Sequence, residues 1–489
     1  MKITIDPITR LEGHGKIEIF VNDRGQVEKA YFVVPELRGF EIFARGRPAE
    51  EMPQITARIC GVCPWAHHFA SAKALDDLWQ VEPPEPARKL RELAYNVFML
   101  EDHALHVYIL GGPDFIVGPR APKARRNVLG VIQTVGLEVG KRVIETRKRL
   151  RWIEQLLGGK TIHPVCGLPG GVSRGLSRGE AEEVRRIADD AVDFALFTHK
   201  VFQDLVLGNG EYVDLIMSET YTHRTYYMGL VDEQNRVDFY DGQIRVVDPQ
   251  GKEFLKFPVQ EYLDHIAEHV EPWTYVKFPF LKKVGWKGFV DGPDSGIYAV
   301  APLARLNASE GMKTPKAQEF YEQFYEVLGG KPAHQTLANH WARVIEMVQA
   351  AERLQQLAYD PLITSPEIRH LPVATPSEGF GVIEAPRGTL IHHYKTDERG
   401  IIQEANLIVA TQNNAARIAL SVDKAARDLV RLDNGQVDEG LLNLVEMAFR
   451  AYDPCHACAT HSLPDGIPLE IEIRNPRGQV IHHWSSSSS

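Results

Sequence analysis

Two short segments near opposite ends of the chain decide how it must fold: Arg58-Ile59-Cys60-Gly61-Val62-Cys63, and Asp453-Pro454-Cys455-His456-Ala457-Cys458-Ala459-Thr460-His461. In each segment two residues separate the cysteines, so both thiolates of one turn can point to a common centre. Thiolates suit soft or borderline metals such as zinc, copper(I), nickel, iron and iron–sulfur clusters. The pairs of a zinc ribbon lie about 15–20 residues apart, whereas nearly the whole chain separates these two. A site that uses both pairs must therefore be assembled by the complete fold.

Cysteine usage points to ligands and not to cross-links. The chain has 5 cysteines, and only Cys166 lies outside the two pairs. This number is too small and too patterned for a disulfide-stapled secreted fold, and we interpret Cys166 as a small buried hydrophobe. Spacing alone leaves three readings open: a catalytic metal, a structural zinc site and a redox disulfide.

Composition excludes several classes of protein. The chain has 489 residues, 44% of them hydrophobic, and a formal net charge of -10 with both signs scattered along it. Nucleic acid is not expected as a partner, because phosphate binding needs a basic stripe. No apolar run approaches the roughly eighteen residues that span a bilayer, and Met1 leads into a strand pattern instead of a signal segment. We therefore expect a cytoplasmic protein without a membrane span.

Periodicity predicts a mainly α fold with smaller β parts (α+β). The alternating N-terminal segments around the turn at 22–25 predict an antiparallel sheet. Helical spacing of apolar residues predicts a central bundle of long helices, approximately at 86–111, 125–157, 178–208, 331–357 and 413–450. Short alternating runs in 209–305 predict a β-containing excursion packed on that bundle. No Pro- or Ser-rich linker divides the chain, so we expect one domain over 1–461.

Together, R-x-C-G-x-C-x-x-x-H near the start and D-P-C-x-x-C-x-x-H near the end resemble the signature of nickel–iron hydrogenase large subunits. The resemblance covers nearly the whole chain and includes five further motifs in the family's order: Thr9-Arg10-Leu11-Glu12-Gly13-His14, Arg38-Gly39-Phe40-Glu41, Asp102-His103, Glu384-Ala385-Pro386-Arg387-Gly388 and Leu407-Ile408-Val409-Ala410-Thr411. It implies the fold of that family and an enzyme that reversibly splits dihydrogen into protons and electrons.

The resemblance also implies a ligand set for the metals. Cys60 and Cys455 would bind nickel terminally, while Cys63 and Cys458 would bridge nickel to an iron that carries carbon monoxide and cyanide. A separate magnesium ion would be held by three groups near the end of the proton path: the Glu41 carboxylate, the Leu407 carbonyl and the His461 imidazole.

The family resemblance assigns catalytic roles to Glu12, Arg387 and Cys455. The Cys455 thiolate would take the proton from dihydrogen, with the Arg387 guanidinium as a competing base, and Glu12 would accept it next. Arg387 and Thr411 would hydrogen-bond the cyanides. Asp102 would support that arginine, and His67 would lie against the nickel thiolates. We assign no role to His68, His392, His393, His482 or His483, which we interpret as surface or packing histidines.

Several partners follow. One cysteine outside the pairs cannot hold an iron–sulfur cluster, which normally takes four, so electrons must leave through an iron–sulfur small subunit. The His67-His68 doublet and the segments at 392–400 and 410–418 resemble the cytoplasmic bidirectional branch. That branch passes electrons to NAD through a diaphorase module, or to another acceptor. Ala410 and His456-Ala457 depart from common family patterns without removing a metal ligand.

The family's maturation implies that an endopeptidase cuts after His461 once nickel-insertion proteins have loaded the site. Residues 462–489 would then be a removable C-terminal extension, although a retained edge strand at 469–475 is the alternative. Two other readings of the whole chain remain. One is an electron-transfer scaffold related to a respiratory complex I subunit that lacks the metal site, and the other is a structural scaffold with zinc on the four thiolates.

Overall fold

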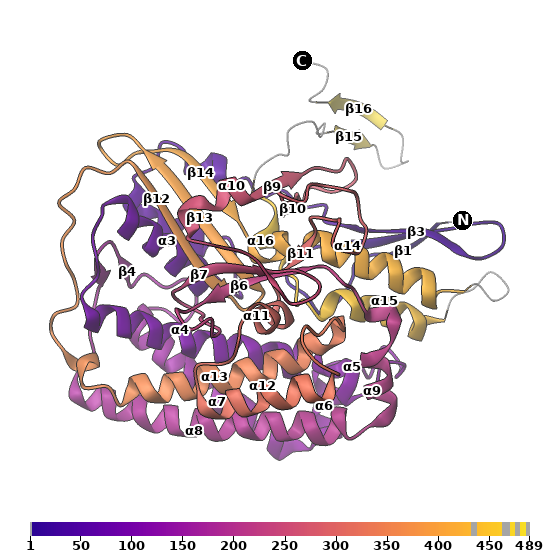
Figure 1. Cartoon of the computed structure of the whole chain (residues 1–489), viewed down its shortest axis with the longest axis horizontal. Helices are drawn as coiled ribbons and strands as arrows, with labels where there is room; N and C mark the ends of the chain where they lie inside the picture. Colours follow the sequence, from indigo (N-terminus) through magenta and orange to yellow (C-terminus); the bar gives the residue numbers. More distant parts are fainter. Residues whose placement is uncertain (1, 432–437, 462–469, 475–479, 486–489) are drawn as a thin grey trace.

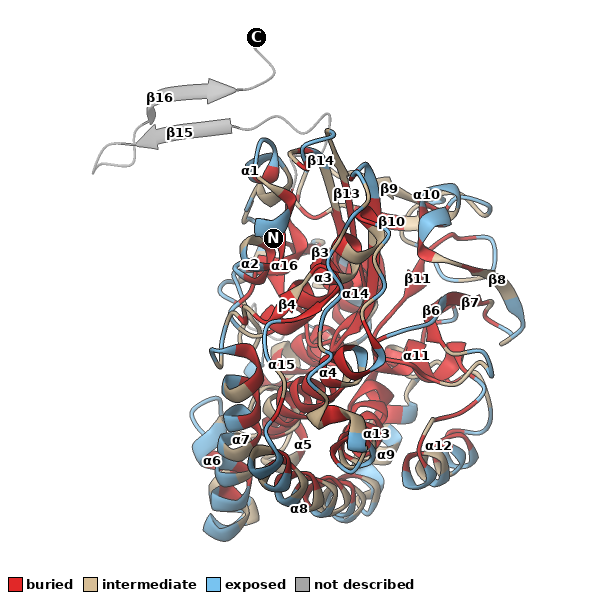
Figure 2. Cartoon of the chain, turned by 90° about the vertical axis from the view of Figure 1, so that its left-hand side faces the viewer, coloured by how far each residue is buried: buried red, intermediate tan, exposed pale blue. Residues whose placement is uncertain are grey.

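Long helices packed side by side form the centre of the protein, seen in the lower half of Figure 1. The structure is a computed structural model that describes all residues except 1, 432–437, 462–469, 475–479 and 486–489. The helices of this bundle are α4 (Glu85–Leu105), α7 (Leu137–Gly158), α8 (Arg178–Phe202), α12 (Pro315–Val327) and α13 (Asn339–Ala358). Figure 2 shows that the outward faces of α7, α8 and α12 are exposed, whereas α4 and α13 are largely buried. The predicted central bundle and the mainly α fold class are confirmed.

Local chemistry sets the ends of these helices. Ser177 and Glu180 form a capping box at the start of α8, with Ser177 N donating to Oε2 of Glu180 at 2.8 Å. Past their last α-helical turns, α4 and α8 continue as π-helical turns, η2 (His106–Leu110) and η3 (Gln203–Leu207). The predicted ranges 86–111 and 178–208 are thus confirmed.

The other helical predictions need correction. Gly136, at a φ of 93°, divides the range 125–157 into α6 (Val128–Val135) and α7. The range 331–357 is not helical at its start: a 3-10 turn, η6 (Thr336–Ala338), leads into α13 at Asn339. A continuous helix over 413–450 is wrong, because α14 (Ala410–Leu429) ends at an extended Val430 and α15 (Glu439–Arg450) is a separate helix. We did not predict α3 (Pro64–Leu78): it is buried on almost all sides and so has no amphipathic period.

The sheets lie on one side of the bundle, above it in Figure 1. The predicted N-terminal antiparallel sheet is confirmed, with the order β1-β2-β3, and its β3 packs on α14. The predicted β-containing region contains a four-stranded sheet in the order β11-β6-β7-β8 and the hairpin β9-β10. A further sheet, β12-β13-β14, packs on α3. These strands are β1 (Lys2–Ile5), β2 (Lys16–Val21), β3 (Val27–Val33), β6 (Tyr226–Val231), β7 (Gln243–Val247), β8 (Glu253–Phe257), β9 (Ile266–His269), β10 (Phe278–Leu281), β11 (Tyr298–Ala299), β12 (Glu378–Ala385), β13 (Gly388–Thr396) and β14 (Ile402–Ile408).

Shorter elements complete the described chain. They are α1 (Phe40–Ala44), α2 (Met52–Ala57), α5 (Gly112–Ile116), α9 (Gly210–Met217), α10 (Tyr262–His265), α11 (Pro302–Ala308), α16 (His456–Ala459), β4 (Gly167–Leu168), β5 (Gly171–Val172), β15 (Glu470–Arg474) and β16 (Val480–Ser485). β15 and β16 pair with each other as an antiparallel hairpin. None of the helices in the described part of the chain combines the length and apolar character needed to cross a membrane.

A buried ion network joins the helix bundle to the sheet β12-β13-β14. Arg305 of α11 has a fully buried side chain, and its Nη2 lies 2.6 Å from Oε2 of Glu346 on α13. Its Nη1 lies 3.0 Å from Oε2 of Glu384 on β12. Because Glu384 stands three residues before Arg387, this network fixes the strand that carries one of the predicted site residues.

The N-terminal segment packs against the second cysteine segment. The backbone carbonyl of Glu12 accepts a hydrogen bond from the N–H of His456 at 2.9 Å, and Arg38 N donates to the carbonyl of Thr460 at 2.9 Å. The sulfur of Cys60 lies 3.4 Å from that of Cys455, so both cysteine segments reach one place, as the sequence required.

Candidate metal centre

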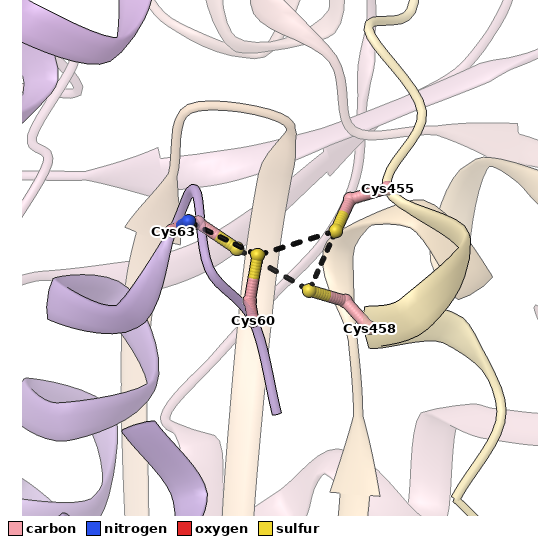
Figure 3. A group of neighbouring side chains, drawn as sticks. All are labelled: Cys60, Cys63, Cys455 and Cys458. Carbon is pink, nitrogen blue, oxygen red and sulfur yellow. Dashed lines mark hydrogen bonds between the residues drawn. The ribbon is translucent and has the colours of Figure 1, made fainter. Parts of the chain in front are cut away.

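The four paired cysteines converge in the interior, as Figure 3 shows. Cys60 and Cys63 come from the turn between α2 and α3, and Cys455 and Cys458 come from the turn of α16. Their sulfur atoms all lie within 4.8 Å of one another, and all four residues are buried. Two sulfur contacts cross from one turn to the other, at 3.4 Å between Cys60 and Cys455 and at 3.3 Å between Cys63 and Cys458. A third, at 2.8 Å, joins Cys455 and Cys458 within one turn.

This donor set fits a metal centre. Four buried thiols gathered around one point offer soft ligands with few other partners. Burial opposes ionisation of the Cys60 thiol, but hydrogen bonds from the other three thiols and the charge of Arg387 lower its pKa well below the ordinary value. Burial and the neighbouring sulfurs raise the pKa of Cys455 and of Cys458 well above it. The cluster by itself thus favours one thiolate, and metal binding would release the remaining protons.

A buried cation lies next to the sulfurs. Arg387 stands in the tight turn between β12 and β13, where Gly388 has a φ of 131°. A Cβ at Gly388 would lie 2.2 Å from Cγ2 of Val300, so only glycine fits there. The guanidinium lies 3.1 Å from Oδ2 of Asp102 through Nη1 and 2.9 Å from Oδ2 of Asp453 through Nη2.

The charges of Arg387, Asp102 and Asp453 depend on one another. Burial would lower the pKa of Arg387, but Asp102 and Asp453 raise it well above its ordinary value. Burial raises the pKa of Asp102 to about 7. Burial would also raise the pKa of Asp453, yet Arg387 and His106 hold it below its ordinary value. Arg387 therefore remains a cation, and its Nε has no hydrogen-bond partner within the described chain.

Glu12 lies directly against one of the thiols. Its Oε2 accepts a hydrogen bond from the thiol of Cys455 at 2.9 Å. Burial, followed by the charge of Cys60, raises the pKa of Glu12. A carboxylate with a raised pKa in contact with a thiol is suited to exchange a proton with it.

Thr411 and His67 also lie in this region. Thr411 begins α14, and its Oγ1 accepts a hydrogen bond from the backbone N–H of Cys455 at 2.9 Å. His67 on α3 is fully buried, and its Nδ1 lies 3.2 Å from Nε2 of His392. Nδ1 of His392 in turn lies 2.7 Å from the hydroxyl of Tyr394.

The three residues predicted to hold magnesium lie close together. Oε1 of Glu41 accepts a hydrogen bond from the backbone N–H of Leu407 at 2.8 Å, and Glu41 N donates to the carbonyl of His461 at 3.4 Å. The imidazole of His461 hydrogen-bonds the carbonyl of Cys458, which places this region next to the cysteines. The carboxylate meets the N–H of Leu407 and not its carbonyl, so magnesium binding stays a prediction.

Sequence reasoning missed several residues around the centre. Asp453 received no role, although it belongs to the D-P-C motif. His106, His340 and Glu346 carry no local signal, because their partners are distant in sequence. Among the histidines without an assigned role, His68, His392 and His393 are buried, so they are packing and not surface residues. The side chains of His482 and His483 lie outside what the structure describes. Cys166 is buried, as predicted.

Comparison with known proteins agrees over the full length. A family model described as nickel-dependent hydrogenase matches residues 38–130 and 142–461, and a second, described as HoxL-like, matches residues 2–37. The iron-sulfur subunit of the F420-non-reducing hydrogenase of Archaeoglobus profundus is 48% identical over 480 residues, covering 98% of each chain. NAD-reducing hydrogenase HoxS subunit beta of Cupriavidus necator is 37% identical over 494 residues, covering 98% of each.

A solved structure agrees as well. The crystal structure of an NAD+-reducing NiFe hydrogenase in the H2-reduced state has a TM-score of 0.88 at 36% identity, and the match covers 94% of this chain and 99% of that one. These similarities, together with four buried thiols within 4.8 Å, confirm the resemblance seen in the sequence. The chain belongs to the nickel-dependent hydrogenase family, as a large, catalytic subunit.

Proposed function

We propose that this chain reversibly cleaves dihydrogen into protons and electrons at a nickel–iron centre held by Cys60, Cys63, Cys455 and Cys458. The observation that carries the proposal is the convergence of four buried thiols from both ends of the chain within 4.8 Å. The contacts between the two turns pair Cys60 with Cys455 and Cys63 with Cys458. The family resemblance would make the first pair the terminal nickel ligands and the second pair the ligands shared with iron. When bound, the two metals would polarise dihydrogen so that a base can remove a proton.

The surroundings support carbon monoxide and cyanide as further ligands of the iron. The unpartnered Nε of the Arg387 cation can donate to an anionic diatomic ligand. The oxygen of Thr411 already accepts from Cys455 N, so its hydroxyl proton is free to point elsewhere. Both donors lie beside the sulfurs, where they would offset the negative charge of the thiolates.

Proton transfer is assigned to Cys455 and then to Glu12. The raised pKa of Arg387 keeps it protonated, which disfavours it as the base and favours the Cys455 sulfur. The 2.9 Å contact between this sulfur and Oε2 of Glu12 gives the proton its next acceptor. Magnesium at Glu41, Leu407 and His461 would organise water farther along, since magnesium keeps several of its waters.

Electrons would leave through an iron–sulfur small subunit. Four cysteines are used at the centre, and Cys166 alone cannot ligate a cluster. Relatives are named NAD-reducing and F420-non-reducing hydrogenases. We therefore propose either a diaphorase module that reduces NAD or another acceptor module as the final partner.

Residues 1–461 would form the mature domain, and residues 462–489 an extension removed by an endopeptidase after nickel insertion. His461 hydrogen-bonds the turn that carries Cys458, so a cut after it would leave the new C-terminus beside the centre. Mass spectrometry of the chain in the purified complex tests this directly. A mature chain that ends at His461 supports the proposal, and a chain that retains 462–489 in active enzyme contradicts it.

The decisive experiment is infrared spectroscopy of the native complex, combined with metal analysis. Carbonyl and cyanide bands with equimolar nickel and iron are expected. Zinc in place of nickel, without diatomic bands, would instead leave a structural scaffold with the hydrogenase fold.

A further inference from the structure

Two stacked histidines, His106 and His340, lie behind the carboxylate of Asp453. His106 begins the π-helical turn η2, and His340 lies in the first turn of α13. The ring centroids are 5.3 Å apart with an interplanar angle of 19°, and Nε2 of His106 lies 3.4 Å from Nδ1 of His340. A Cβ at Gly111 would lie 2.5 Å from Nε2 of His106 and 2.7 Å from Cε1 of His340. Glycine at this position is thus what makes room for the pair.

His106 contacts Asp453, one of the two carboxylates that pair with Arg387. Nδ1 of His106 lies 3.1 Å from Oδ1 of Asp453, whose Oδ2 lies 2.9 Å from Nη2 of Arg387. The ring N–H does not line up well with the oxygen, so the contact is mainly electrostatic. All these groups are buried, which strengthens such contacts.

These contacts assign the ring protons. A lone pair on Nδ1 of His106 would be repelled by the carboxylate, so Nδ1 carries the proton and Nε2 is an acceptor. Nδ1 of His340 must then donate to Nε2 of His106, which leaves a lone pair on Nε2 of His340. That buried atom has no hydrogen-bond partner within the described chain. Burial lowers the pKa of His106 to about 4 and that of His340 well below its ordinary value, so both rings are neutral.

We propose that the two stacked histidines position Asp453, and through it Arg387, beside the cysteines. His106 and His340 are thus positioning residues for the hydrogenase reaction. The inference rests on the proposed function, because the orientation of Arg387 matters for catalysis only if the thiols hold the metals.

Substitution tests the positioning role. His340→Leu should shift the infrared bands of the iron-bound ligands and lower hydrogen oxidation about tenfold to a hundredfold, with nickel content retained. His340→Gln should restore most of both, because its amide N–H can donate to Nε2 of His106 in place of the ring. The matched control is His199→Leu on α8, a buried histidine whose ring stacks on Phe320 at a centroid distance of 3.5 Å. The control should keep wild-type bands.

The two proposals fail in different ways. Wild-type bands in a folded His340→Leu variant overturn the positioning role alone. Wild-type protein that lacks both nickel and diatomic bands overturns the proposed function, and this inference with it.

Discussion

Oε2 of Glu12 accepts a hydrogen bond from the thiol of Cys455 at 2.9 Å, although the two residues are 443 positions apart in the chain. A backbone bridge between the same residues fixes the distance, since the carbonyl of Glu12 also accepts from His456 N at 2.9 Å. The backbone contact that docks the N-terminal segment therefore also places the Glu12 carboxylate against the metal centre.

Replacement of Glu12 should block proton transfer and leave the centre intact. Glu12→Gln keeps the shape of the side chain but cannot take the proton from Cys455. We expect hydrogen oxidation and exchange of hydrogen with D2O to fall about a hundredfold or more, the usual size of a lost acid–base group. Activity assays with infrared spectra and nickel analysis on the same sample check this result.

The same Glu→Gln substitution at Glu18 serves as the control for Glu12. Glu18 on β2 lies 2.7 Å from Nζ of Lys16 and 3.2 Å from Nζ of Lys2, in ion pairs on the outer part of the N-terminal sheet. Glu18→Gln should leave activity unchanged. Wild-type exchange in Glu12→Gln would show that protons leave Cys455 by another route.

Loss of one thiol of the cluster should strongly reduce metal loading. Cys63→Ser replaces a soft ligand by a hydroxyl that does not ionise at neutral pH, so nickel per chain should fall by at least about tenfold. Cys166→Ser changes the one cysteine outside the cluster, where the sulfur lies 3.9 Å from Nε2 of His68, and should keep full nickel content. Elemental analysis of both purified variants decides the matter; full nickel in Cys63→Ser would remove this residue from the ligand set.

Sequence alone predicted the parts of this site that carry a fixed spacing. The two cysteine pairs and Glu12 lie in compact motifs, so their types and order could be read directly. Asp453, His106 and His340 act through partners on other elements, and no local pattern marks such contacts. α3 was missed for a related reason, because burial on all sides removes the amphipathic period. Over 413–450, apolar residues keep their helical spacing across the break between α14 and α15, and this spacing hid the local cap at Asp438, whose carboxylate accepts from the N–H groups of Gly440 and Leu441.

Removal of Arg305 should destabilise the protein strongly. Its fully buried guanidinium pairs with Glu346 and Glu384, so Arg305→Ala leaves two buried carboxylates without their cation. We expect a loss of about 3–5 kcal/mol in the free energy of unfolding. The exposed pair of Arg399 and Asp397, at 2.9 Å, provides the contrast, with less than about 1 kcal/mol lost in Arg399→Ala. Equal midpoints of urea unfolding for the two variants would contradict the structural role of the network.

The same network predicts how stability changes in acid. Burial opposes ionisation of Glu346, but Arg305 and His103 lower its pKa from 4.5 to about 2. A carboxylate with a lowered folded pKa stabilises the protein above its unfolded pKa, and this contribution is lost as pH falls from 4.5 towards 2. His103 lowers stability at higher pH than Glu346 does. Burial lowers its pKa from 6.5 to about 4, so the unfolded chain binds a proton there first and stability falls as pH drops from 6.5 towards 4.

Glu346→Gln separates the contribution of Glu346 to the pH dependence of stability from that of His103. It removes a carboxylate that would otherwise contribute a slope of up to about 1.4 kcal/mol per pH unit between its unfolded and folded pKa. We therefore expect the variant to be less stable at pH 7 and to lose stability less steeply below pH 4.5, while the decline that begins near pH 6.5 persists. Unfolding free energies measured by urea titration at a series of pH values test this. Parallel curves for wild type and variant below pH 4.5 would mean that the pKa of Glu346 is not lowered in the folded protein.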